Sequence, residues 1–189
     1  MAKTNAPTIE TLWKEIDAWL KKNAKVAHAS LQKGASKAAL TKLEQALGVK
    51  VPADLAAWLS IHDGQAPDSG ITVVGNWDLL SCDRIADAHA ALQRQEQKGI
   101  LGESKDGLVK PVWWNPKWIP FMESPAGDFH CVDLDPTLKG EAGQIVTWFH
   151  DAEFRNRKAE SLTAYFAEYL SDLRSEYYEL EENGSLRLQ

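Results

Sequence analysis

Apolar residues recur at three- and four-residue steps through the first part of the chain, which is the spacing of amphipathic helices. Thr8 is a suitable N-cap for a first helix, whose apolar stripe consists of Ile9, Leu12, Trp13, Ile16, Trp19 and Leu20. Ser36 can cap a second helix that ends at Gly48, where a left-handed residue is favoured. Pro52 suits the first position of a third helix, because its missing N–H costs nothing there, and Gly64 ends that helix. The pattern therefore predicts three short helices in series.

After the three predicted helices, the sequence contains runs of residues that are typical of strands. Residues 71–74, Ile-Thr-Val-Val, are β-branched and bounded by glycines, which predicts a short strand. Ser81 can cap a helix over about 83–97, and the aperiodic, glycine-containing residues 98–112 predict a surface loop. Three further apolar runs are separated by turn-forming residues and predict consecutive strands over 118–122, 129–134 and 144–149.

A last apolar stripe follows Ser161 and predicts a helix running towards Asn183-Gly184. Helices first, strands next and a final helix predict an α+β fold, in which an antiparallel β-sheet meander is flanked by the N-terminal helices and a C-terminal helix. A chain of 189 residues has the length of one domain. We therefore expect residues 1–189 to form a single domain with a core over about residues 9–180.

Charge and composition narrow the class of partner. The chain has 21 Lys and Arg against 27 Asp and Glu, a net charge of −6, and 44% hydrophobic residues, which excludes a disordered chain. Residues 1–50 carry nine lysines and only four acidic residues, so the acidic excess lies in the rest of the chain. Such a surface favours a basic protein partner and argues against nucleic acid, although on charge alone ordinary solubility is the favoured explanation.

Location and redox state follow from the apolar runs and the cysteines. No apolar run approaches the length of a membrane span or of a secretory signal, so a cytoplasmic protein without membrane association is expected. The two cysteines, Cys82 and Cys131, cannot form a disulfide framework, and we interpret them as reduced thiols in the core.

Two His-Asp dipeptides are the strongest hint of catalysis, because a carboxylate can orient an imidazole base. His62-Asp63 and His150-Asp151 are both of this kind, but adjacent residues of a strand point to opposite faces, and structural roles are favoured. A metal site built from His130, Cys131 and His150 is rejected for the same geometric reason. No nucleophile, phosphate-loop or metalloprotease motif is present. The sequence thus predicts no catalytic residue, no metal and no cofactor.

Eight tryptophans are the most unusual feature of the composition. Trp113 and Trp114 are adjacent in an extended segment, so one ring is expected in the core and the other near the surface. An exposed Trp beside acidic residues is typical of the anchors that dominate protein–protein interfaces. For Trp114 two interpretations stay open, an interface anchor or a cover over the sheet beneath the long loop.

Several phrases, taken together and in order, resemble the SUKH superfamily, specifically its Smi/Knr cell-wall assembly regulator group. They extend over about residues 9–170, and no single phrase is decisive. The phrases are Leu12-Trp13, Gly34-Ala35-Ser36, Leu43-Glu44, Pro52-Ala53-Asp54-Leu55, Ile61-His62-Asp63-Gly64-Gln65, Trp113-Trp114-Asn115-Pro116, Cys131-Val132-Asp133-Leu134-Asp135-Pro136 and Gly143-Gln144-Ile145-Val146.

The resemblance implies an α+β fold and a protein-binding role without catalysis. Bacterial members resemble immunity proteins that neutralise secreted toxins, and fungal members act in the regulation of cell-wall glucan synthesis. Because the chain looks like a near-minimal domain without long flanks, the favoured expectation is an immunity protein that occludes the catalytic domain of a cognate toxin. The alternative is a regulatory adaptor that binds an endogenous partner.

The expected contact surface combines acidic and aromatic side chains, with residues 65–78 and the loop 98–112 choosing the partner. Polar contacts are expected from the helix-to-strand region, at Asp63, Gln65, Asp68 and Asp78. The aromatic anchor is expected to be Trp77 or Trp114. Turns at the strand ends are expected to extend the acidic patch through Asp128, Asp135 and Asp151.

Overall fold

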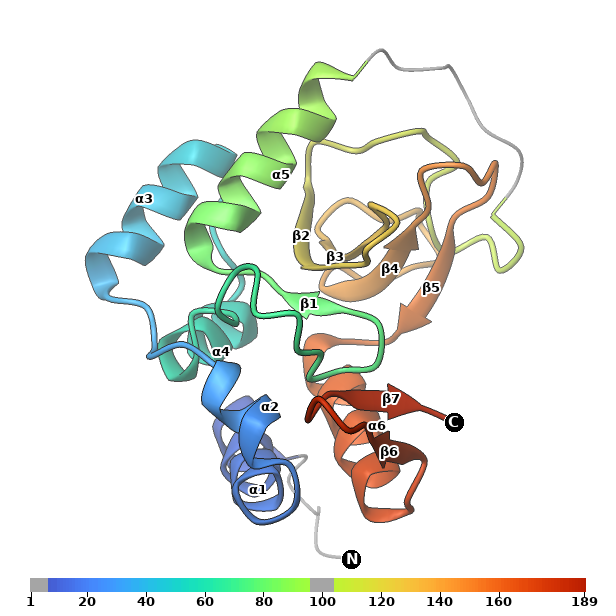
Figure 1. The fold of residues 1–189 in the computed structure, drawn as a ribbon. Coiled ribbons are helices and arrows are strands. Elements are labelled where there is room, and N and C mark those ends of the chain that lie inside the picture. The colour runs from blue at the N-terminus through green and yellow to red at the C-terminus, as the bar shows by residue number, and fades with distance from the viewer. Residues whose placement is uncertain (1–6, 96–103) are drawn as a thin grey trace, which may run out of the picture.

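The computed structural model describes residues 7–95 and 104–189 (Figure 1). Its helices are α1 (Ile9–Asn23), α2 (Lys25–Ser30), α3 (Lys37–Leu47), α4 (Ala53–Ile61), α5 (Cys82–Arg94) and α6 (Leu162–Arg174). The side chains of Thr8, Ser36, Ser81 and Ser161 each accept a hydrogen bond from the backbone N–H three residues further on, as N-caps do. Gly48 ends α3 in the left-handed conformation, with φ +68°. These capping residues are confirmed, whereas Pro52 is the N-cap of α4 and not its first residue, and α4 ends at Ile61, before the predicted stop at Gly64.

Five antiparallel strands form the main sheet in the order β1-β2-β3-β4-β5. They are β1 (Asp78–Leu79), β2 (Trp118–Glu123), β3 (Phe129–Asp133), β4 (Gln144–Trp148) and β5 (Asn156–Ala159). Because neighbouring strands in the chain are neighbours in the sheet, this is the α+β meander expected from the sequence.

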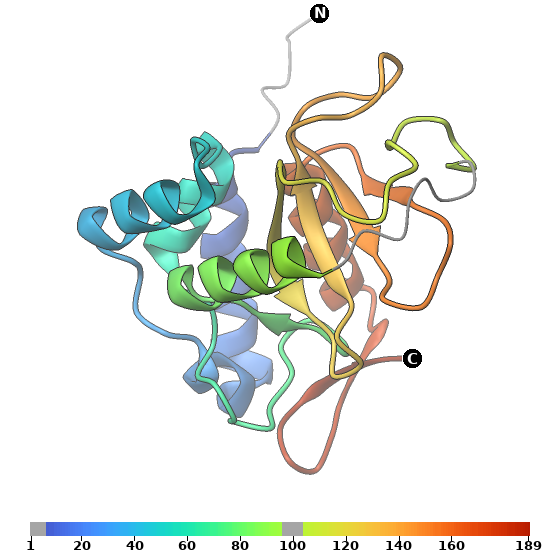
Figure 2. The same ribbon diagram turned by 90° about the horizontal axis from the view of Figure 1, so that it is seen from above.

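Helices α5 and α6 cover opposite faces of the sheet, as Figure 2 shows. Successive side chains of β3 point to opposite faces of the sheet. Phe129 borders the groove beside Leu92 of α5, whereas the ring of His130 lies 5.4 Å from the ring of Tyr165 on α6. A second aromatic cluster joins α6 to the N-terminal helices, where the Phe166 ring lies 5.1 Å from the Trp13 ring. The residues that surround Trp77, described below, therefore occupy the α6 side of the sheet.

The predicted strand over 71–74 is wrong. Only an isolated bridge joins Val74 to Trp77, and the first strand lies further on, at Asp78–Leu79. The backbone groups of the predicted strand have other partners: the Ile71 carbonyl accepts from the Gln65 side chain, and the Thr72 carbonyl accepts from the Leu186 amide. β-branched composition alone did not reveal these competing bonds.

The last helix is shorter than predicted. It ends at Arg174, and a two-stranded hairpin follows, made of β6 (Tyr178–Leu180) and β7 (Leu186–Leu188). Asn183-Gly184, which the sequence analysis interpreted as a helix end, instead belongs to the connection of this hairpin, a role that Asn-Gly often has. The hairpin places Tyr178 beside α6, where the rings of Tyr169 and Tyr178 lie 5.4 Å apart.

The remaining differences are smaller. Helix α2 and strand β5 were not predicted, and α5 ends at Arg94. Of the predicted loop 98–112, residues 98–103 lie outside the described residues; in the rest, Val109 is fully buried. Cys82 and Cys131 are free and buried, as predicted. No helix within 7–95 or 104–189 is long and apolar enough to cross a membrane.

Candidate functional site

The segment from the end of α4 to the first residue of β1 contains five of the residues that the sequence placed at a partner interface. Two of them stabilise the segment itself. The Asp63 carboxylate accepts a hydrogen bond of 2.7 Å from the backbone N–H of Cys82, at the start of α5. Gln65 is buried, and its amide donates to the Ile71 carbonyl and to Asp78 while accepting from the Leu79 N–H. Gln65 is therefore corrected from a contact residue to a buried link between the two ends of this segment.

The other three residues of the segment are accessible. Asp68 is exposed at a left-handed position, with φ +57°, and Trp77 and Asp78 are partly exposed. Burial raises the pKa of the Asp78 carboxyl, and Arg84, 4.0 Å away, opposes that rise. The Trp77 ring lies on the ring of His130, with 3.8 Å between centroids. The segment thus presents one aromatic ring between acidic side chains.

Trp114 is a core residue, which decides between the two interpretations left open above. It is 1% exposed and packs edge-on against Trp118 and Trp148, at 5.8 and 6.3 Å between ring centroids. Trp113 is also buried, so the expectation that one of the two rings lies near the surface is wrong. Both fit into the core because the Trp113 carbonyl accepts hydrogen bonds from the Trp148 indole and from buried Arg155.

The acidic residues of the strand ends do not form one patch. Asp128 and Asp151 lie at the end of the sheet where β3 begins, and Asp135 follows the opposite end of β3. Asp135 forms an ion pair of 2.7 Å with Lys110. Because Asp78 pairs with Glu123 and Glu123 with the first residue of β3, Asp78 shares the Asp128 end of the sheet. Asp135 is therefore separated from the other predicted contacts.

Neither His-Asp dipeptide acts as a pair. The Nε2 atom of His62 lies 2.9 Å from Asp17, and the Nδ1 atom of His150 lies 2.8 Å from Asp128, so each histidine bonds a distant carboxylate. The hydrogen bond to Asp128 raises the pKa of the exposed His150. Asp128, His150 and Asp151 place their possible metal-ligating atoms within 4.8 Å of one another, but the group is largely exposed and its hydrogen bonds account for its geometry. We do not treat it as a metal centre.

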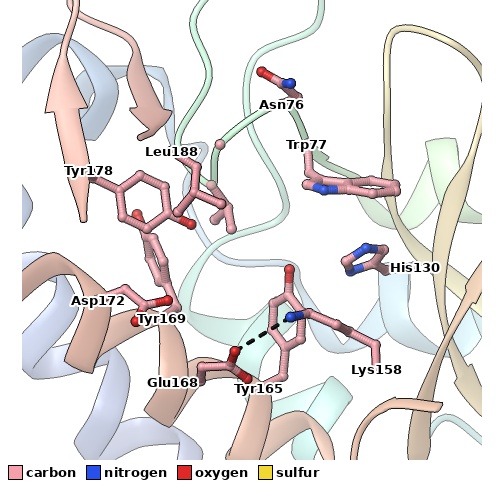
Figure 3. Close-up of a pocket in the computed structure, with 12 residues that line it drawn as sticks. Asn76, Trp77, His130, Lys158, Tyr165, Glu168, Tyr169, Asp172, Tyr178 and Leu188 are labelled. Carbon is pink, nitrogen blue, oxygen red and sulfur yellow. Dashed lines mark hydrogen bonds and ion pairs between the residues drawn. The ribbon is translucent and has the colours of Figure 1, made fainter.

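A pocket of about 230 Å³ lies directly beside Trp77, and Figure 3 shows the side chains that enclose it. Its walls come from the loop before β1, from strands β3 and β5, from helix α6 and from the C-terminal hairpin. The aromatic wall consists of Trp77, His130, Tyr165, Tyr169 and Tyr178. The charged side chains are Lys158, Glu168 and Asp172.

Hydrogen bonds and burial fix the inner wall of this pocket. The Tyr169 hydroxyl donates to the Val73 carbonyl at 2.5 Å, and Lys158 lies 3.4 Å from Glu168. Burial, helped by the nearby Lys158 charge, lowers the pKa of His130 to about 3, so its imidazole is neutral at physiological pH. The only predicted contact residue in the pocket is Trp77.

Sequence reasoning missed most of the pocket. Tyr165, Tyr169 and Asp172 recur at helical spacing on α6, and Glu168 and Asp172 are four residues apart, so a stripe of tyrosines bordered by acids was a readable signal. In the sequence, that stripe predicted only the apolar side of the last helix. Tyr178 carried no such signal, because it reaches the pocket through the hairpin.

Comparison with known proteins identifies the class to which this α+β fold belongs. Residues 34–168 match the SMI1 / KNR4 family (SUKH-1), and the chain belongs to that family, as the sequence phrases indicated. The matched range includes His130, Lys158 and Glu168 of the pocket, and it ends before Asp172 and Tyr178.

The relatives are fungal proteins named as regulators. The chain is 26% identical to "Cell wall biosynthesis/cell cycle regulator smi1" of Schizosaccharomyces pombe over 96% of this chain and 40% of the relative. It is 24% identical to "Cell wall assembly regulator SMI1" of Saccharomyces cerevisiae, over 96% of this chain and 44% of the relative. It is also 24% identical to "Glucan synthesis regulatory protein" of Neurospora crassa, over 96% of this chain and 41% of the relative. The chain thus spans less than half the length of these relatives.

Proposed function

We propose that this chain is a protein-binding regulatory domain that performs no chemistry of its own. The observation that carries the proposal is the position of Trp77: a partly exposed indole, followed in the chain by Asp78, at the mouth of an aromatic pocket. Trp and Tyr are the residues that most often dominate binding energy at protein interfaces. The names of the three relatives given above, each of which describes a regulator, support a regulatory role over catalysis.

The hydrogen bonds of the histidines support the same choice. A hydrolytic site needs an imidazole within reach of a nucleophile and oriented by a carboxylate. His62 bonds Asp17 through Nε2 and lies 2.9 Å from the Gln32 carbonyl through Nδ1, so both ring nitrogens are engaged by acceptors. An enzyme would show turnover that His62→Ala or His150→Ala abolishes, and we expect partner binding to survive both changes.

The cellular role that we propose is that of the named relatives: regulation of cell-wall assembly through an endogenous protein partner in the cytoplasm. The acidic excess of the chain beyond residue 50 favours a basic partner surface, because opposite charges speed encounter and discourage acidic competitors.

Toxin neutralisation, the role that the sequence favoured, stays a prediction with its own support in that acidic excess. It requires a toxic effector whose catalytic domain the chain would cover. Co-expression with the product of an adjacent effector gene tests it: restored growth supports neutralisation, and unrelieved toxicity of every adjacent effector rejects it.

Affinity purification from the source cell, followed by mass spectrometry, tests the binding proposal. The wild-type chain is compared with Trp77→Ala and with Trp19→Ala, a matched control, because Trp19 is also only partly buried but lies on α1. We expect one or more proteins to be recovered with the wild type and Trp19→Ala and to be depleted with Trp77→Ala. Equal recovery with all three chains would reject the Trp77 surface as the binding site.

A further inference from the structure

The imidazole of His130 belongs to the aromatic wall of the pocket beside Trp77. His130 is 4% exposed, and its Nδ1 atom is buried without a hydrogen-bond partner among the described residues, so a ligand in the pocket does not reach that atom in this arrangement. Because burial keeps the imidazole neutral, the ring does not repel a cationic donor.

The charges of the pocket favour a donor, and specifically a cation. Lys158 pairs with Glu168, whereas the Asp172 carboxylate has no ion pair or hydrogen bond within the described part of the chain. Figure 3 places Asp172 on the side of Glu168 away from Lys158. One negative charge is therefore left without a partner, next to aromatic rings that attract cations to their faces.

The size and rim of the pocket point to a single side chain presented by another polypeptide. Its volume of about 230 Å³ is below the roughly 300–1,000 Å³ typical of small-molecule sites. The hairpin at its rim exposes large apolar side chains over which a partner chain can lie, namely Tyr177, Leu180 and Leu188, at 59%, 53% and 51% exposure. Exposed apolar surface of this kind marks sites of protein–protein interaction.

We propose that this pocket receives one arginine side chain of a partner protein, with its guanidinium between the aromatic walls and donating to the carboxylate of Asp172. Arginine fits better than lysine because its planar guanidinium stacks on rings and offers several donors in fixed directions. The inference rests on the proposed function, since it assigns the partner chemistry of the same surface.

Nuclear magnetic resonance titration of the full chain tests the inference with a defined probe, N-acetyl-arginine amide. The readout is the indole N–H signal of Trp77, assigned by its absence in Trp77→Phe. N-acetyl-citrulline amide keeps the shape and removes the charge, N-acetyl-lysine amide keeps the charge, and a β-1,3-glucan trisaccharide represents the sugar class. We expect saturable shifts with the arginine probe and at least about tenfold weaker binding of the other three.

Two substitutions locate the binding. Asp172→Asn is nearly isosteric. It is expected to weaken binding of the arginine probe by about tenfold or more, because a charge-assisted hydrogen bond is lost. Asp87→Asn, an exposed acid on α5, is the matched control and is expected to leave binding unchanged. Tyr178→Leu, which removes one aromatic wall, provides a second variant if Asp172→Asn proves unfolded by circular dichroism.

The inference is overturned if citrulline binds as well as arginine, if binding survives both pocket variants, if only the trisaccharide shifts Trp77, or if no probe does. Its failure is distinguishable from failure of the proposed function. A partner whose recovery depends on Trp77 but not on Asp172 would keep the protein-binding proposal and reject the arginine pocket.

Discussion

The imidazole of His62, at the end of α4, contacts two segments that are distant in the chain: its Nε2 lies 2.9 Å from the Asp17 carboxylate of α1, and its Nδ1 lies 2.9 Å from the Gln32 carbonyl in the connection after α2. Both nitrogens face acceptors, so the doubly protonated ring satisfies both. Although burial opposes the charge, the hydrogen bonds to Asp17 and Gln32 raise the pKa of His62. The pKa of Asp17 is lowered, because the bonds to His62 outweigh the burial of its carboxyl.

Asp17→Asn is therefore expected to destabilise the protein more at low pH than at high pH. A raised folded-state pKa contributes stability that is fully present below the unfolded value of about 6.5 and is lost as pH rises through the folded value. We expect a loss of about 1.5–3 kcal/mol at pH 6, the range for hydrogen bonds to charged groups, and a smaller loss at pH 8.5. Urea unfolding of wild type, Asp17→Asn and the exposed control Asp87→Asn at both pH values measures this. A loss that is the same at pH 6 and pH 8.5 would contradict the charged pair.

His130 has the opposite effect on stability. Burial and the Lys158 charge lower its pKa to about 3, so only the unfolded chain binds this proton between about pH 6.5 and 3. The free energy of unfolding therefore falls as pH falls, by about 1.4 kcal/mol per pH unit. Between pH 6.5 and pH 5 the loss is about 2 kcal/mol. His28, whose pKa burial also lowers, adds to the same trend, whereas His62 opposes it.

The contribution of His130 is isolated by comparison with His130→Phe, which cannot titrate. We expect its unfolding free energy to fall by about 2 kcal/mol less than that of the wild type over the same pH interval. Parallel pH profiles for the two proteins would contradict a buried neutral His130.

The capping residues and the meander were predictable because they depend on local sequence. Ser36, Ser81 and Ser161 act through residues three positions away, and the strands alternate with clear turn residues. The pocket depends instead on partners distant in the chain: Tyr178 reaches it through a hairpin, and Trp77 meets His130 from another strand. Local periodicity carries no information on such contacts. That residues 1–189 form one domain, and that the remaining surface acids contact a partner, stay predictions.

Gln65→Ala is expected to destabilise the protein by about 2–4 kcal/mol, because one buried amide supplies three hydrogen bonds and its loss leaves the Leu79 N–H and the Ile71 carbonyl without that partner. Gln93→Ala on the exposed face of α5 is the control and should change stability by less than about 0.5 kcal/mol. Chemical denaturation measures both. A Gln65→Ala loss no larger than that of the control would show that water replaces the amide at no cost.

Arg155→Lys is expected to be costly although it preserves the charge. The Arg155 side chain is fully buried, lies 5.5 Å from the Trp113 and Trp148 ring centroids and donates to the carbonyls of Ala152, Phe154 and Trp113. A lysine cannot reproduce the planar fork, so we expect a loss of about 2–4 kcal/mol. Thermal unfolding beside Arg94→Lys, on the exposed end of α5, checks it. Equal melting temperatures for the two variants would contradict a role for guanidinium geometry.

The most direct test of the account is the dissociation constant between the purified chain and the protein recovered with it from the source cell. Because truncation of a central aromatic anchor typically costs 2 kcal/mol or more, we expect Trp77→Ala to weaken binding by about 30-fold or more. Trp19→Ala, on α1, should bind within about threefold of the wild type, which is less than 1 kcal/mol. Equal dissociation constants for the three chains, or a chain that binds no protein at all, would contradict the claim that this surface works by binding another polypeptide.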